Sequence, residues 1–482
     1  MLGDALALDH PPPVFRRAQI TITVMAAAIA VLAFTETAPI IVIRYAALFV
    51  FALQIWIEII RRDYIFLKSP VFLLGFAACV GFSLLPSSGY FIAQGGYIPH
   101  LNMDSFTRMF TRPDILTYFG DTAEFYILAF SVVALFTYGI VQLVLRKWPP
   151  PAALPISGAI ERALMAISFA LTGLATLNFA LHPFPPSVSG VLSSAYPPLQ
   201  SILVMVLAHQ YFTKESGAFR FAATGISVIV FYAATAQAKA PLFLLVSVLF
   251  YYAYVKKISV SSAVKLSLAL FVFIFVVAQV SQVMRSKGSS IIHQGDLDIT
   301  MAMDIFTGKM FWRQVDTGAC LSNVIGANLI KKPANPDHMF WLRGLVPRML
   351  WPEKESLSLG SKYAVAYCQT PVETRHSASI TLLGQPIIKA GIAGMVIHTG
   401  ILLAALGTLT WIAIRYPGLG AVSVMALLPW WIDFDQDFAL YVANLVKFFL
   451  LMCLILIPLF WLGRSNAPAN TRTTEISSRT VD

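Results

Sequence analysis

The sequence predicts an all-α polytopic membrane protein with about twelve transmembrane helices, and three observations support that prediction. Apolar residues make up 57% of the 482 residues and charged residues only 12%, against roughly 25% charged in soluble domains. The apolar residues gather in stretches of about 20, the length that crosses a bilayer. One long polar segment interrupts these stretches late in the chain. Soluble, secreted, fibrous and disordered classes are therefore excluded.

Twelve apolar stretches are candidate spans, placed between a polar N-terminal segment over 1–18 and a Ser/Thr-rich tail over 463–482. Nine of them fall within 19–282 and three within 379–462. They cover 19–36, 38–59, 66–86, 123–144, 159–180, 189–212, 219–236, 240–255, 263–282, 379–414, 418–433 and 438–462. The eighth and eleventh are short, and the tenth is long enough to contain a re-entrant start.

The distribution of cations predicts the orientation. With both termini in the cytoplasm, the cytoplasmic segments hold seventeen Lys and Arg residues. The short outer loops then hold only Arg108, Arg112 and Lys239. Because cytoplasmic loops carry an excess of Lys and Arg, this bias predicts that both termini are cytoplasmic.

The polar segment over 283–378 then becomes one large outer loop between the ninth and tenth spans, and a second, aromatic outer loop covers 87–122. Loops this long are uncommon unless they are functional. In the large loop four cations alternate with three aromatic residues: Arg343, Arg348, Lys354 and Lys362 with Trp341, Trp351 and Tyr363. Arginine forks bind phosphate oxygens, and aromatic rings stack on sugars. The pattern predicts a site for a phosphorylated glycan, and an interfacial amphipathic segment is the alternative of equal weight.

Four further cations are candidates for holding an anion. Arg285 follows the ninth span and Arg313 lies in F-W-R-Q-V-D, where interfacial anchoring is the alternative role. Lys239 is the only cation in the short loop before the eighth span, which indicates a bound anion. Lys389 lies inside the tenth span, where a charge marks either pairing or a functional cavity.

Two more charges, Arg44 and Lys447, lie inside the second and twelfth spans. Asp433, Asp435 and Asp437 cluster at the outer turn between the last two spans. These carboxylates could neutralise the two cations, act in acid/base chemistry or bind a cation. Structural pairing is the favoured interpretation, because a buried charge is costly without a partner.

His376, at the end of the long loop, is the best-placed general base, since imidazole can take a proton near neutral pH. A plain surface histidine is the alternative. The sequence contains no G-x-x-x-x-G-K-[ST], H-E-x-x-H or G-x-S-x-G motif. An ATP-driven pump, a zinc protease and a Ser hydrolase are thus disfavoured, and no metal, cofactor or nucleic-acid partner is expected.

Two of the four cysteines, Cys320 and Cys368, fall in the large outer loop. In a bacterium this loop faces an oxidising compartment, where disulfides persist. The sequence therefore predicts a disulfide that staples the loop.

Five short motifs of the C-terminal half, taken in order, resemble the bacterial O-antigen and exopolysaccharide repeat-unit polymerases, the Wzy-like family. They are A-Q-A-K-A-P at 236–241, R-S-K-G at 285–288, F-W-R-Q-V-D at 311–316, G-L-V-P-R-M-L-W-P-E-K at 344–354 and S-A-S-I-T-L-L-G-Q-P-I-I-K-A-G-I-A-G at 377–394. The N-terminal half is similar to the family in hydropathy and topology alone.

The resemblance implies a C-type glycosyltransferase that joins oligosaccharide units carried on undecaprenyl diphosphate. It implies action at the periplasmic face of the bacterial inner membrane, without metal or cofactor, beside a chain-length regulator and a flippase. It also implies that Lys239, Arg285, Arg313 and Arg348 grip diphosphate or anionic sugar and that Lys354 supports them. Together with the candidates argued from the residues themselves, we expect the catalytic residues to be Arg348, His376 and Arg313. The expected substrate-binding residues are Lys239, Arg285, Arg343, Lys354, Lys389 and Trp351.

Two positions depart from the family pattern: Gln385 stands where Glu is common, and Lys389 where Asn is common. If that Glu is catalytic in the family, its role must pass here to His376 or to the acidic turn. Three alternatives stay open. They are an O-antigen ligase that transfers lipid-linked glycan to lipid A core, a polysaccharide transporter or flippase, and a structural subunit of an export complex.

Overall fold

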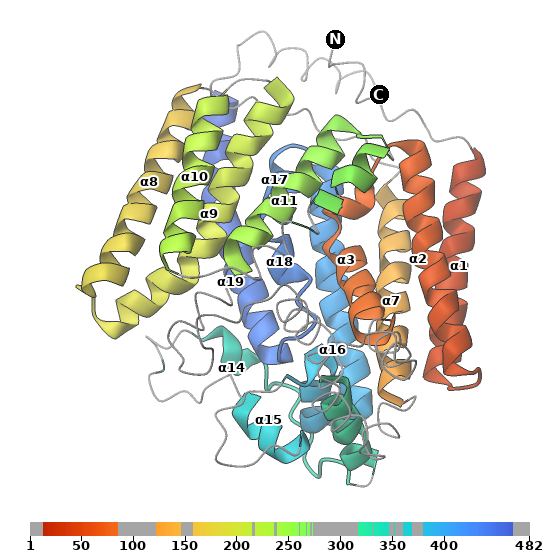
Figure 1. Ribbon diagram of the computed structural model, residues 1–482. Coiled ribbons are helices and arrows are strands. Elements are labelled where there is room, and N and C mark those ends of the chain that lie inside the picture. The colour runs from red at the N-terminus through yellow and green to blue at the C-terminus, as the bar shows by residue number, and fades with distance from the viewer. Residues whose placement is uncertain are drawn as a thin grey trace, which may run out of the picture. The chain divides into compact units, whose positions relative to one another are not determined.

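The computed structural model describes residues 13–84, 122–145, 158–214, 217–235, 239–259, 317–329, 331–346, 351, 360–368 and 379–465, with nine positions between 261 and 272. Every regular element in these ranges is helical, and no strand occurs in them (Figure 1). The predicted all-α class is confirmed for this part of the chain.

Seven of the described helices are long and apolar enough to cross a membrane. They are α1 (Pro13–Phe34), α2 (Ile40–Arg61), α7 (Thr122–Leu145), α8 (Gly158–Leu181), α9 (Pro186–Lys214), α16 (Thr381–Arg415) and α19 (Phe438–Ser465). Shorter apolar helices are α3 (Pro70–Cys79), continued by η3 (Val80–Leu84), α10 (Ala218–Ala234) and α11 (Lys239–Lys256). The chain is thus a helical polytopic membrane protein, while the count of twelve spans and the orientation stay predictions. Most of the ninth predicted span lies outside the described residues.

The eleventh predicted span, 418–433, is not one continuous helix. It consists of α17 (Leu419–Ala426) and the single turn α18 (Leu428–Trp431), with Leu427 between them. Pro429 explains the division, because a proline lacks the amide hydrogen of the helical bond and disfavours helical geometry at the preceding residue. Neither piece is long enough to span a bilayer.

The chain divides into two compact units, and each is described separately. In the first unit, which covers 1–147, 259–411 and 429–446, α1, α2, α3 and α7 pack side by side (Figure 1). Gly139 of α7 permits close approach, because a Cβ atom there would lie 2.2 Å from the Thr23 hydroxyl of α1. Small residues at such crossings let membrane helices approach and gain packing energy.

A buried ion pair joins two helices of this unit. The Arg44 guanidinium of α2 binds both carboxylate oxygens of Glu124 of α7, with Nη2 2.7 Å from Oε2. Ser83 donates to the same carboxylate. Pairing of Arg44 with the acidic turn at 433–437 stays a prediction. Hydropathy averages identify the spans but do not show which helices pack against each other. Glu124 was therefore not predicted as a partner of Arg44.

A second buried carboxylate, Glu58 of α2, is fully saturated with donors. Gln54 and Gln142 side-chain amides each lie 2.7 Å from Oε1, and the Tyr138 hydroxyl also donates to it. The Phe66 backbone amide donates to Oε2 at 2.7 Å. Because buried polar groups are costly unless they are hydrogen-bonded, this network locks α2 to α7.

The second unit covers 148–258, 412–428 and 447–482 and contains α8, α9, α10, α11 and α17. Its apolar core includes Tyr196, Val204, Val228 and Tyr232. Gln200 of α9 crosses to α8, where its amide donates to the Ser168 carbonyl at 2.9 Å. In this unit the Lys447 ammonium lies 4.9 Å from the centre of the Phe448 ring, a cation–π contact.

Candidate functional site

The structure describes three of the nine predicted site residues with their side chains: Arg343, Trp351 and Lys389. Lys239 is the first residue of α11, and only its backbone is described. The other five, Arg285, Arg313, Arg348, Lys354 and His376, lie outside the described residues. Their roles stay predictions, so the site is built from the surroundings of Arg343 and Lys389, both in the first unit.

Arg343 and Lys389 both contact one residue, Asp337. The Asp337 amide donates to the Lys389 carbonyl at 2.9 Å, and its carboxylate lies 3.7 Å from the Arg343 guanidinium. Arg343 belongs to the single turn α14 (Leu342–Leu345), and its side chain is 62% exposed. Lys389 is half-buried, and within the described ranges no carboxylate reaches ion-pair distance of its ammonium. The Arg343 side chain and the Lys389 backbone are therefore both joined to Asp337.

The turn that carries Arg343 is held on α16 by His398. Its Nε2 lies 2.9 Å from the His338 carbonyl oxygen, and its Nδ1 lies 2.6 Å from the Gly394 carbonyl oxygen. The Trp341 indole donates to the same His338 carbonyl at 3.1 Å. Phe340 is buried, with its ring centre 5.3 Å from that of His398. The segment that contains Arg343 is thus bound to α16, the helix that carries Lys389.

Helix α16 is broken at Gly391, just after Lys389. Gly391 has φ 73° and ψ −178°, a conformation that only glycine adopts at low cost. The break leaves carbonyl groups of α16 before Gly391 without helical partners. Two donors from the preceding polar segment form hydrogen bonds with these carbonyls. Asn328 donates its side-chain amide to the Ile387 carbonyl at 3.2 Å, and the Asp337 amide reaches Lys389. A re-entrant start of the tenth span stays a prediction.

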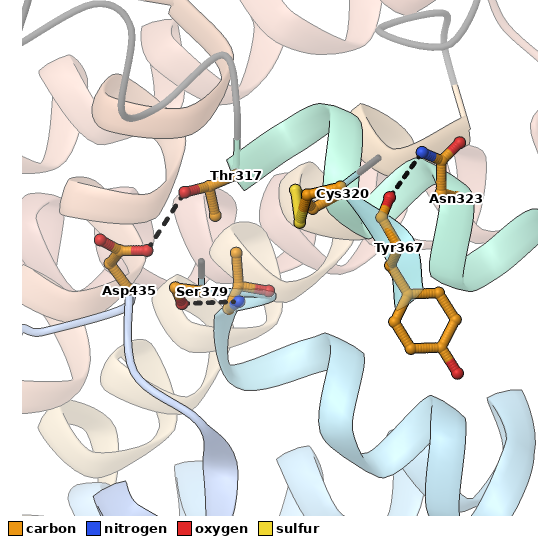
Figure 2. The surroundings of a disulfide bond; sticks show 8 residues. Thr317, Cys320, Asn323, Tyr367, Ser379 and Asp435 are labelled. Atoms are coloured by element: carbon orange, nitrogen blue, oxygen red, sulfur yellow. Dashed lines mark hydrogen bonds between the residues drawn. A yellow bond between two sulfur atoms is a disulfide. The ribbon is translucent and has the colours of Figure 1, made fainter. Parts of the chain in front are cut away.

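A disulfide joins Cys320 to Cys368, as the sequence predicted, with 4.8 Å between their Cα atoms. It links the helix over 317–329 to α15 (Gly360–Tyr367), and Figure 2 shows its neighbours. The Asn323 side-chain amide donates to the Tyr367 carbonyl at 2.7 Å. The bridge and this bond fasten the two helices together, and we call this pair, 317–329 and 360–368, the stapled cap.

The acidic turn at 433–437 lies against the stapled cap. Thr317, at the start of the cap helix, donates to Asp435 at 3.3 Å (Figure 2). Gln436 donates to Asp433 at 2.7 Å. Asp437 precedes the first residue of α19, and its carbonyl accepts the Tyr441 amide. The turn thus binds the cap and begins α19.

Gln385, the residue that departs from the family pattern, has a structural contact. It is buried, and its side-chain oxygen accepts the Ala439 amide of α19 at 2.7 Å. Ala439 is in the first turn of α19, whose amides have no partner inside the helix. An Asp at position 437 would ordinarily accept that amide. Gln385 therefore caps α19 and joins it to α16.

One buried hydroxyl of the cap remains unused. Tyr363 of α15 is 6% exposed, and in the described part of the protein its oxygen has no partner in hydrogen-bonding geometry. Burial raises the pKa of Tyr363 above its usual range, and the charge of Asp437 raises it further, while interaction with the Gln385 side chain lowers it.

Sequence reasoning missed Asp337, His398 and Glu124. Asp337 follows a proline in N-P-D-H, which is a turn signal, but its contacts depend on α16. His398 and Glu124 are ionisable residues within apolar stretches, a pattern that marks function or pairing and could have identified them. Tyr363 was named among the aromatic residues of the large loop, but its burial was not predicted.

The described ranges contain no group of three His, Cys, Asp or Glu residues that could hold a metal ion. No protein-family model, no curated protein and no solved structure matches the chain.

Proposed function

We propose that this protein is a membrane glycosyltransferase that joins undecaprenyl-diphosphate-linked oligosaccharide units at the outer face of the bacterial inner membrane. The observation that supports it best is that the Arg343 side chain and the Lys389 backbone both meet Asp337, beside the break in α16. Both cations were predicted from the residues themselves as candidates for binding the substrate.

The chemistry of such a reaction suits these groups. The leaving group is a diphosphate, so fixed cations stabilise the negative charge that develops in the transition state. Arg343 offers a fork of donors, and Lys389 offers a point charge. Trp351, 43% exposed, provides an apolar face for a sugar ring. Arg285, Arg313, Arg348, Lys354 and Lys239 would extend the cationic surface.

The test is the product of cells that lack the chromosomal copy and express variants of the full chain. Arg343→Ala and Lys389→Ala should leave mostly single repeat units on the lipid, whereas the wild type makes long glycans. Lys331→Ala and Lys332→Ala are matched controls, because both are exposed cations of the same segment without a predicted role. Long glycans in the Arg343→Ala, Lys389→Ala double variant would contradict the proposal. Loss of transfer to lipid A core alone would indicate the ligase.

The break in α16 favours one second candidate, a transporter of lipid-linked glycan. Transporters place substrate at discontinuous helices whose free carbonyls and amides line a cavity. In this protein, however, Asn328 and Asp337 occupy two of the freed carbonyls. Liposomes that hold the protein and a lipid-linked glycan separate the candidates, because a transporter moves the glycan across the bilayer and leaves its length unchanged.

A further inference from the structure

The imidazole of His398 faces a carbonyl oxygen at each of its two nitrogens. Its Nδ1 lies 2.6 Å from the Gly394 oxygen, and its Nε2 lies 2.9 Å from the His338 oxygen. The residue is 3% exposed, so the ring is withdrawn from solvent. Both partners are acceptors, because a carbonyl oxygen has no hydrogen to donate. Each ring nitrogen therefore needs a hydrogen of its own to form a hydrogen bond here.

A neutral imidazole cannot form both bonds, because one of its nitrogens carries a hydrogen and the other a lone pair. In either neutral form a lone pair of the ring would face a carbonyl lone pair across 2.6 or 2.9 Å. The imidazolium form has a hydrogen on both nitrogens and satisfies both carbonyls. Hydrogen bonds from a charged donor are also stronger than neutral ones, which offsets the cost of burying the charge. These contacts therefore assign the imidazolium form to His398.

The surroundings of the ring are aromatic. The ring centres of Phe340 and Phe438 lie 5.3 and 5.7 Å from that of His398. The titratable group that faces it is His338, which is exposed and whose ring stacks on it at 5.7 Å. In the described part of the protein no ion pair reaches the His398 imidazole from the nearest charged residues of the packed segments, which are Asp337, Arg343, Lys389 and Asp437.

We propose that His398 is a pH-sensitive switch, which binds the Arg343 turn (337–345) to α16 in its imidazolium form and releases it on losing a proton. The inference does not depend on the proposed function. When the proton passes to water, the neutral ring keeps one bond and replaces the other by a repulsion between lone pairs. The docked turn binds more protons than the released turn. Its stability is therefore complete at low pH and falls as the pH rises.

The experiment measures hydrogen exchange of the full-length protein in detergent at about pH 5.5 and about pH 8.5, on either side of the range in which imidazole ordinarily titrates. Rates are corrected for the intrinsic pH dependence of amide exchange. The Asp337 amide, which donates to the Lys389 carbonyl, reports the docked turn. Its protection should fall at least about tenfold at the higher pH, the effect of losing one hydrogen bond from a charged donor. His398→Gln should show equal protection at both pH values, because an amide does not titrate.

Two other histidines supply matched controls. His338→Phe retains the stacked ring and the backbone carbonyl while it removes the exposed titratable group. His209→Gln removes a histidine of the second unit, whose partner, the Tyr251 hydroxyl, can either donate or accept. Both variants should keep the pH dependence of the wild type. Loss of that dependence in His338→Phe would assign the switch to His338 and overturn the inference.

A second measurement needs no variant. Solid-state NMR of the wild type, labelled in histidine nitrogens and glycine carbonyl carbons, identifies the ring beside the Gly394 carbonyl. That ring should carry a hydrogen on both nitrogens at the lower pH and on one at the higher pH. A neutral ring at the lower pH would overturn the switch. The same holds for equal protection of Asp337 at both pH values in the wild type, or for an equal change in His398→Gln.

Discussion

His398 and the backbone of His338, sixty positions apart, are joined by a hydrogen bond of 2.9 Å that fixes the Arg343 turn on α16. The same imidazole contacts the Gly394 carbonyl of its own helix. One side chain therefore connects the predicted cationic motif to the helix that contains both Lys389 and the break at Gly391.

Replacing His398 by alanine should release the turn over 337–345. The His338 carbonyl would lose a bond and the Phe340 ring would lose a packing partner, a cost of roughly 1–3 kcal/mol for the polar group alone. Hydrogen exchange of the Asp337 amide, which is bonded to Lys389, should accelerate. His209→Ala is the control, because His209 bonds Tyr251 in the second unit. Unchanged exchange at Asp337 would contradict this role of His398.

Breaking the Arg44–Glu124 pair should destabilise the first unit strongly. Arg44→Ala leaves a buried carboxylate uncompensated, at a cost of about 3–5 kcal/mol. The double change Arg44→Met, Glu124→Leu should recover much of that loss, because no buried charge remains. Thermal unfolding in detergent measures both. Arg343→Ala, which removes an exposed arginine, should change stability by less than about 1 kcal/mol.

The disulfide predicts a pattern of thiol reactivity. After denaturation without reductant two cysteines, Cys79 and Cys453, should be alkylated, and after reduction all four. Replacing Cys320 and Cys368 by serine should destabilise the stapled cap by as much as ~4 kcal/mol for a loop of 48 residues, in the chain-entropy account. Limited proteolysis within 317–368 reports this loss. Four reactive thiols in the unreduced mature protein would contradict the bridge.

Arg348→Ala should abolish long glycans while the protein still inserts in the membrane. The reason is the proposed loss of charge stabilisation at the leaving diphosphate. Lipid-linked glycans separated by size provide the measurement, with Lys332→Ala as the control. Normal chain lengths in Arg348→Ala would remove Arg348 from the site.

Hydropathy was sufficient to locate most spans, because each is an autonomous apolar stretch of bilayer length. α2, α7, α8 and α19 begin within a few residues of the predicted positions. The disulfide was also predictable, since two cysteines in one outer loop have few alternatives. Contacts between distant segments were not predictable. The partner of Arg44, the cap that Gln385 provides and the burial of Tyr363 each depend on how helices far apart in the chain pack.

The stapled cap has a consequence for how the protein is made. Cys320 and Cys368 both precede α16 and α19 in the chain, so both leave the ribosome before those helices do. The bridge can thus close on an unfinished polypeptide, and a chain truncated at residue 380 should already form it. The closed cap would then serve as a template on which the last helices dock during synthesis. If the cell were depleted of thiol oxidase, the helices would still insert, but α16 and α19 would dock without the closed cap as a template.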